Sequence, residues 1–118
     1  MRTGGAGPDV ELLRVLNQGA QRVLSNEARP YDVGIALMGE LMAPMMDGAE
    51  FAGTAYTMWG ELTDGIDGPP RYARGLDEGE IEDLMRQAAT EWLALDPSSE
   101  NMRIYFERWH LWPESLVP

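Results

Sequence analysis

The stretch that decides the fold is Asp77-Glu-Gly-Glu-Ile-Glu-Asp-Leu-Met-Arg-Gln-Ala-Ala-Thr-Glu-Trp-Leu93. Asp77 and Glu80 have the spacing of a capping box, in which each side chain accepts a hydrogen bond from the backbone N–H of the other residue. Apolar residues then return every three or four positions, as in a helix with one buried face. They are Ile81, Leu84, Met85, Ala88, Trp92 and Leu93. The stretch therefore predicts a helix with Asp77 as its N-cap.

The same periodicity continues on the N-terminal side of this helix, interrupted by Pro, Gly and Asp. We expect a first helix to follow Pro8. A second is expected from about Asp32, its N-cap, to the residue before Pro44. A third is expected from Asp47, where Glu50 completes another capping box. Because the second segment is apolar almost all round, we expect it to be the most buried helix.

On the C-terminal side, Asp96-Pro97 predicts the start of a fifth helix, because proline is preorganised for the first helical position. Its apolar stripe would be Met102, Tyr105, Phe106, Trp109 and Trp112. The segment from Gly65 to Gly75 contains Gly-Pro-Pro and predicts a surface loop. No alternation typical of strands is found. The sequence thus predicts an all-α fold, a compact bundle of four to five helices.

Length and composition favour one domain. A chain of 118 residues, 44% of them hydrophobic, is large enough for a single core. We expect residues 1–7 to be a flexible N-terminus and residues 8–118 to be the single helical domain. The absence of cysteine excludes disulfides, thiolate metal sites and cysteine nucleophiles. With neither a secretory h-region nor an apolar run of about 20 residues, the protein is expected to be cytoplasmic, without membrane attachment.

The charge of the chain is strongly negative. Twenty acidic residues against nine arginines give a formal charge of -11. Such a charge repels phosphate backbones and anionic lipids and attracts cationic molecules. We therefore expect a basic protein partner and no binding of nucleic acid. The sequence leaves the oligomeric state open.

Motifs of known catalytic mechanisms are missing from the sequence. The one histidine, His110, lies between Trp109 and Leu111, where a packing or surface role is favoured over catalysis. The spacings of zinc proteases, nucleophile elbows and phosphate-binding loops do not occur. We expect no enzymatic activity and no cofactor.

Three carboxylates, Glu61, Asp64 and Asp67, recur every three residues and would follow one edge of a helix. Carboxylate oxygens are ligands that Mg²⁺ and Ca²⁺ prefer. Helical carboxylate sites, however, usually combine ligands from several helices. The pattern favours a solvated helix edge without a metal, and a metal-dependent helical enzyme is the weaker alternative.

A second group of acids crowds the first turns of the helix at residues 77–93. Capping needs only Asp77 and Glu80, so the charges of Glu78, Glu82 and Asp83 add repulsion that stability alone would not select. This surplus favours a basic partner. The predicted partner-binding residues are Glu61, Asp64, Asp67, Tyr72, Glu78, Glu82, Asp83 and Trp112.

The methionines and the C-terminal tryptophans allow two interpretations. Methionines on the expected inward stripes fill gaps in a core by default, although clustered methionines can also line adaptable binding surfaces. We expect a core role for Met38, Met42, Met58 and Met85. Trp109 and Trp112 lie three residues apart and are hard to bury together, so one of them is expected at the rim of an interface.

Three runs, Tyr56–Asp64, Met85–Leu93 and Tyr105–Trp109, resemble those of small bacterial helical proteins. In size, acidity and helicity the chain is similar to the immunity proteins that neutralise colicin-type or polymorphic toxins. The resemblance implies a non-catalytic inhibitor that blocks a basic partner such as a nuclease toxin. That family is defined by its partners, so the resemblance assigns no site residues. The alternative is a structural or homo-oligomeric helical interaction protein.

Overall fold

The computed structural model describes residues 7–110 of the chain. In this range the protein forms five α-helices and one short 3-10 helix, with no strand. They are α1 (Pro8–Leu24), α2 (Pro30–Met46), α3 (Ala52–Asp67), η1 (Pro70–Ala73), α4 (Glu78–Leu93) and α5 (Ser99–Trp109). The predicted all-α bundle is confirmed. Of the expected flexible N-terminus, residues 1–6 lie outside the described range, and Gly7 is the N-cap of α1.

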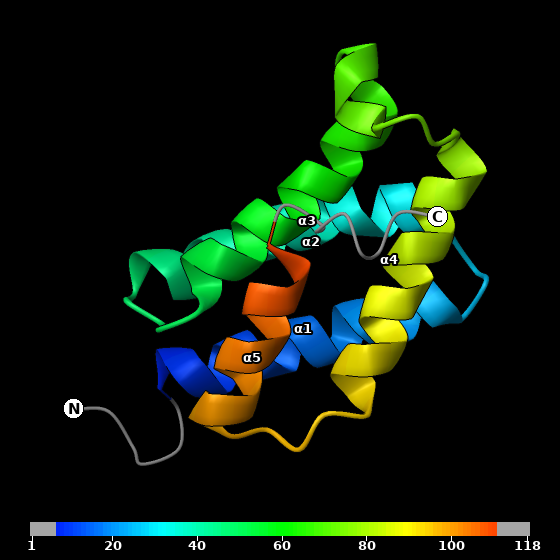
Figure 1. The fold of residues 1–118 in the computed structure, drawn as a ribbon. Helices are drawn as coiled ribbons and strands as arrows, with labels where there is room; N and C mark the ends of the chain where they lie inside the picture. Colours follow the sequence, from blue (N-terminus) through cyan, green and yellow to red (C-terminus); the bar gives the residue numbers. More distant parts are fainter. Residues whose placement is uncertain (1–6, 111–118) are drawn as a thin grey trace.

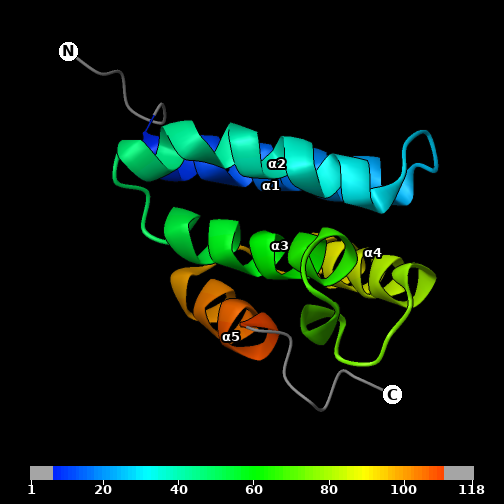
Figure 2. The same ribbon diagram turned by 90° about the horizontal axis from the view of Figure 1, so that it is seen from above.

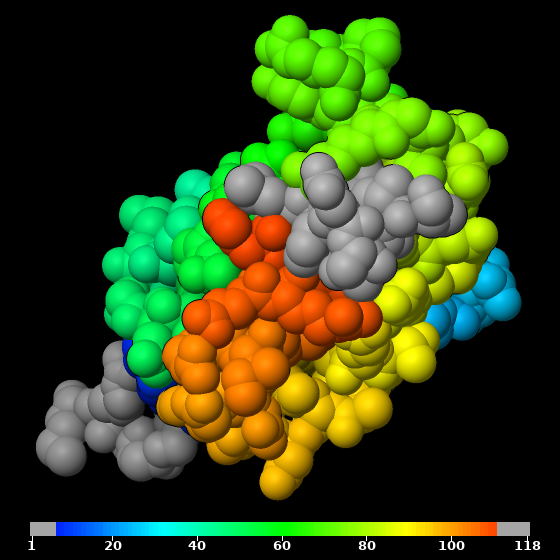
Figure 3. All heavy atoms as spheres, viewed as in Figure 1, coloured from blue at the N-terminus to red at the C-terminus, as the bar shows by residue number. Residues whose placement is uncertain are grey.

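The first three helices run back and forth, and α2 packs against both neighbours: it lies above α1 in Figure 1 and beside α3 in Figure 2. Helix α4 packs against α1, and α5 lies across α3 and α4. The C-terminal end of α3 and η1 project beyond the rest of the bundle (Figure 3). This arrangement leaves one face of α2 outside the bundle.

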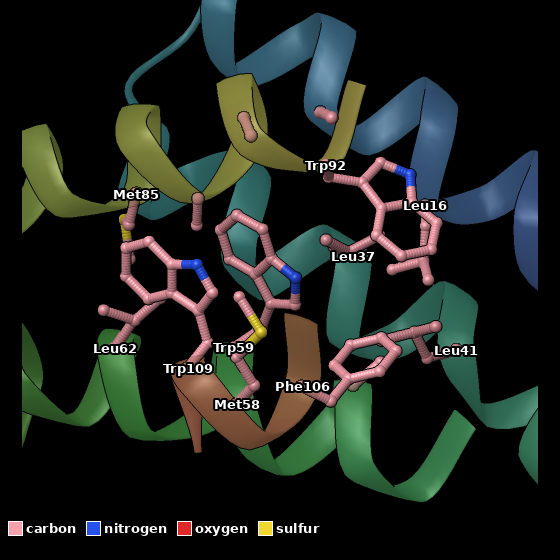
Figure 4. Packing of buried hydrophobic residues seen from close by; sticks show 14 of the residues in the cluster. Leu16, Leu37, Leu41, Met58, Trp59, Leu62, Met85, Trp92, Phe106 and Trp109 are labelled. Carbon is pink, nitrogen blue, oxygen red and sulfur yellow. The ribbon is translucent and has the colours of Figure 1, made fainter. Parts of the chain in front are cut away.

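All five helices contribute to one core. Its members include Leu16 of α1, Leu37 of α2, Trp59 of α3, Met85 of α4 and Trp109 of α5 (Figure 4). The core roles predicted for Met58 and Met85 are confirmed, since both side chains are buried. Met38 is only partly buried, and the prediction for Met42 is wrong because its side chain is exposed.

The predicted capping box of α4 is confirmed. Asp77 Oδ1 accepts a hydrogen bond from the Glu80 N–H at 2.8 Å, and Glu80 Oε1 accepts one from the Asp77 N–H at 3.0 Å. The predicted apolar stripe of α4 is buried except for its last residue, Leu93, which is exposed at the helix end.

The boundaries predicted for α2 are wrong at both ends. The helix begins at Pro30, two residues before Asp32, because proline suits the first helical position. It continues through Pro44 to Met46. Proline lacks only one backbone N–H, and Pro44 lies in the last turn, where its carbonyl still accepts the Ala49 N–H at 2.9 Å.

The predicted start of α3 at Asp47 is also wrong. Asp47 is instead the C-cap of α2, and Gly48 follows it with a φ of +88°, a left-handed conformation that ends helices. The Glu50 N–H donates to Asp9 Oδ1 of α1 at 3.0 Å. A contact between distant segments thus replaces the expected local capping box, and α3 begins at Ala52.

Two further boundaries differ from the predictions. The segment from Gly65 to Gly75, predicted to be a surface loop, is largely helical. Helix α3 runs to Asp67, and the 3-10 helix η1 covers Pro70–Ala73. Helix α5 begins at Ser99 and not at Pro97, because the Ser98 side chain accepts a hydrogen bond from the Asn101 N–H at 3.1 Å.

Aromatic and polar contacts fix α5 on the bundle. Phe106 stacks on Phe51 with ring centroids 5.6 Å apart. The Tyr105 hydroxyl donates to the Ala88 carbonyl at 2.8 Å, and burial raises the pKa of this phenol. Trp109 is buried, and its indole N–H donates to Glu91 Oε1 at 2.8 Å.

Glu91 is the polar centre of the contact between α4 and α5. Arg108 donates to both of its carboxylate oxygens at 3.0 Å, and Gln87 adds a hydrogen bond at 3.1 Å. These donors, Arg108 foremost, lower the pKa of Glu91 to about 2. The carboxylate therefore stays ionised and keeps the two helices joined.

Glycines let α2 approach its neighbours closely. A β-carbon on Gly34 would lie 2.9 Å from Thr63 Cγ2 of α3, and one on Gly19 of α1 would lie 2.8 Å from Leu37 Cδ1 of α2. The close approach of α2 to α3 therefore requires a glycine at position 34. Gly39 has no such neighbour within 4 Å, because it lies on the outer face of α2.

Replacing Gly34 and Gly39 with alanine tests this packing. We expect Gly34→Ala to lower the free energy of unfolding by about 1 to 2 kcal/mol, because the added methyl group displaces the stiff, buried Thr63. Gly39→Ala is expected to raise it by about 0.5 to 1 kcal/mol through helix propensity alone. Urea unfolding followed by circular dichroism measures both. Equal effects at the two positions would contradict the close packing of α2 on α3.

Candidate binding surface

Acidic residues of α3 and α4 meet at the N-terminal end of α2. The Tyr31 hydroxyl donates to Asp67 Oδ2 of α3 at 2.7 Å, and the Tyr31 backbone N–H donates to Glu82 Oε2 of α4 at 3.2 Å. The hydrogen bond from Tyr31 to Asp67 also raises the pKa of the phenol. Tyr31 thus connects the two groups of acids, which the sequence separates.

Arg29 neutralises part of this cluster. Its guanidinium donates to Glu78 Oε1 at 2.5 Å and to Glu82 Oε2 at 3.3 Å. The hydrogen bond to Glu78 is the main cause of the raised pKa of Arg29. From the sequence, Glu78 and Glu82 were predicted to be surplus to stability, but these ion pairs show that both have structural partners. Local patterns give no signal for pairs this far apart in the chain.

Glu82 has a further structural role as the cap of α2. Arg29 occupies the N-cap position of α2, but its side chain makes no capping hydrogen bond. The first N–H groups of a helix need acceptors from elsewhere. The Glu82 carboxylate accepts the Tyr31 N–H and is largely buried, with 13% of its side chain exposed. Asp32, predicted as the cap, is exposed.

The other predicted acids are more open to solvent. The Asp83 carboxylate pairs with Arg86 at 2.6 Å, and 75% of its side chain is exposed. Asp64 is exposed and Glu61 is half-buried, and neither carboxylate has a hydrogen bond or ion pair with another residue of the described range. We call the set Asp32, Glu61, Asp64, Asp67, Glu78, Glu82 and Asp83 the acidic end.

Two aromatic residues, Tyr72 and Trp112, were among the predicted partner-binding residues, and the structure describes only the first. Tyr72 lies on η1 with 39% of its surface exposed, and the Arg71 guanidinium lies 5.0 Å from the centre of its ring. Tyr72 is therefore available on the projection next to the acidic end. Trp112 lies outside the described residues.

The outer face of α2 is an exposed apolar surface that was not predicted from the sequence. Ile35, Met42 and Met46 are 44%, 41% and 79% exposed. The expectation that α2 is the most buried helix is therefore wrong for this face, because α2 contacts α1 and α3 only on its flanks and inner side. The spacing gave a partial signal, since these residues form one helical stripe. The opposite stripe is equally apolar, so periodicity alone could not decide which one is buried.

No metal-binding group occurs within residues 7–110, where no three carboxylate or imidazole side chains are close enough to share an ion. His110 and Glu107, spaced as in a Glu-x-x-His pair, line a surface hollow of about 320 Å³ between α3 and α5. Glu107 is already paired with Arg103 at 2.5 Å, and His110 makes no hydrogen bond to another residue of that range. Within residues 7–110, no hydrogen bond joins His110 to Thr54 or Glu107, the other two groups of the lining that could pair with it.

No known protein family, curated protein or solved structure matches the chain. The resemblance to immunity proteins thus stays a prediction from the sequence. Among the described helices, none has the length and apolar character that crossing a membrane requires.

Alanine substitutions at Glu82 and Asp83, which are adjacent in α4, compare the stability contribution of a capping carboxylate with that of an exposed one. We expect Glu82→Ala to lower the free energy of unfolding by about 1 to 2 kcal/mol, because α2 loses its N-terminal acceptor and Arg29 loses a partner. Asp83→Ala removes only an exposed pair, so its effect is expected within about 0.5 kcal/mol of zero. Urea unfolding compares the two variants. If both were equally stable, Glu82 would not be the cap of α2.

Proposed function

We propose that this protein is a non-catalytic inhibitor of the immunity or antitoxin kind, which binds a basic partner such as a nuclease toxin in the cytoplasm. The observation that carries the proposal is the convergence of two separate groups of acids on one end of the bundle, around Tyr31. A nuclease must attract a phosphate backbone, so its cleft is cationic. An anionic surface that fits this cleft excludes the nucleic acid by charge and shape.

The contacts of the acidic end suit this role. Asp67, Glu78 and Glu82 are held by Tyr31 and Arg29, so little side-chain freedom would be lost on binding. Asp64 and Asp83 extend into solvent and can meet cationic groups of a partner. Tyr72 on the neighbouring projection supplies an aromatic side chain, the type that dominates binding energy at interfaces.

A homo-oligomeric helical protein is the second candidate function. The exposed apolar face of α2 favours it, since apolar patches on a protein surface mark interaction sites. The negative charge of the chain opposes it, because two copies would repel each other. We therefore rank the inhibitor first.

Co-expression tests the inhibitor proposal. The candidate partner is the product of a toxin-like reading frame next to the gene of this protein, and its toxicity is expected to disappear when both are expressed together. The association rate of the purified pair is expected to fall by at least about tenfold from about 0.01 M to about 1 M salt, as the Debye length shrinks from about 30 to about 3 Å. Stopped-flow fluorescence measures this rate. A pair that associates equally fast across this range, or does not associate, would refute the proposal.

Two matched variants localise the effect. Asp64→Asn and Asp96→Asn make the same chemical change at exposed carboxylates, neither of which has a polar partner in the described range. Asp64 belongs to the acidic end, and Asp96 follows α4 at its far end. At low salt, Asp64→Asn is expected to slow association by about two- to fivefold, and Asp96→Asn by less. The opposite order would place the binding surface elsewhere.

A further inference from the structure

The outer face of α2 continues onto α3. The methyl carbon of Met38 lies 3.3 Å from the position that a β-carbon on Gly60 would occupy, and the sulfur of Met45 lies 4.0 Å from the corresponding position on Gly53. The two glycines of α3 thus leave room for partly buried methionines of α2. We call the resulting surface the methionine face, which consists of Ile35, Met38, Met42, Met45 and Met46.

The length and the flexible side chains of the methionine face suit the binding of one helix. Its exposed stripe from Ile35 to Met46 spans twelve residues, whose ends lie about 16 Å apart at a rise of 1.5 Å per residue. That length corresponds to about three turns of a partner helix. Methionine side chains are flexible and polarisable, so they adapt to the side chains that pack on them.

Acidic residues predominate among the charged residues around this face. Residues 30–70 contain seven acids and no arginine, lysine or histidine. Asp32 lies before the stripe, Asp47 and Glu50 lie after it, and Asp64 lies on the exposed side of α3. None of their four carboxylates has an ion pair or a hydrogen bond with another residue of the described range. The two arginines next to α2 are already paired, Arg22 with Glu40 and Arg29 with Glu78 and Glu82. Unpaired carboxylates therefore lie before and after the methionine face.

This distribution selects one occupant. A second copy of the chain would bring the same unpaired acids, Asp32, Asp47, Glu50 and Asp64, toward this surface, which like-charge repulsion opposes. A helix with apolar residues on one face and basic residues at both ends complements the face in both respects. We propose that the methionine face docks a cationic amphipathic helix of the partner, a refinement that rests on the proposed inhibitor function. Asp32 and Asp47 place the basic ends of that helix about 15 residues apart.

A pair of synthetic peptides tests the docking. The first is a helix of about five turns with leucine and tryptophan on one face and arginines at both ends. The second has the same composition in an order that spreads the apolar residues around the helix. We expect the amphipathic peptide to bind at least about tenfold more tightly, measured by fluorescence anisotropy of the labelled peptide. Equal binding of the two peptides would show attraction by charge alone and overturn the proposal.

Matched variants of the protein identify the surface. Met42→Gln with Met46→Gln changes two exposed side chains to polar ones of similar length, and Ile104→Gln does the same on the exposed side of α5. We expect the double variant to weaken binding of the amphipathic peptide by about tenfold or more and Ile104→Gln to leave it unchanged. An unchanged affinity of the double variant for the peptide would overturn the proposal. The proposal would also fail if sedimentation equilibrium showed that the unmodified protein is a dimer and that the double variant is a monomer.

The same double variant separates this inference from the proposed function. In one outcome, the unmodified protein neutralises the toxic partner with salt-dependent association, and Met42→Gln with Met46→Gln binds that partner normally. The inhibitor function then stands, but the methionine face is not the docking site. If the amphipathic peptide binds as expected but the neighbouring gene product does not, the inhibitor function fails and the face remains a docking site for a helix of another protein.

Discussion

The close approach of α2 to α3 at Gly34 is the constraint on which the rest of the structure depends. The absence of a side chain there lets the two helices meet at Thr63, and Gly19 of α1 gives the same room to Leu37 on another side of α2. With its inner stripe fixed in this way, α2 turns its second apolar stripe to solvent. A helix with two apolar stripes thus serves both the core and the surface.

The N-terminus of α2 is fixed by a second interaction, its cap from α4. Glu82 reaches from α4 to the backbone of Tyr31, and Asp67 reaches from α3 to its hydroxyl. Capping by distant carboxylates gathers negative charge where three helices meet, and Arg29 offsets only part of it. Stability and a potential binding surface therefore share the same carboxylates. This sharing explains why acids that hold the fold together are also suited to attract a basic partner.

The sequence predicted those features whose causes are local. The capping box of α4 depends on two residues three positions apart, and it is present as predicted. The start of α3 was predicted wrongly because the Glu50 N–H finds its acceptor on Asp9, far away in the chain. The acidic residues were found by composition, but their connection through Tyr31 depends on packing. The exposed face of α2 could not be predicted, since its two stripes are equally apolar.

The central claim is that α2 packs through one apolar stripe and leaves the methionine face open in the isolated protein. Methionine methyl resonances report on it directly when a neutral, soluble gadolinium chelate is added. We expect strong relaxation enhancement for the methyl groups of Met42 and Met46 and little for those of the buried Met58 and Met85. Protection of Met42 and Met46 equal to that of Met58 and Met85 would contradict an open methionine face.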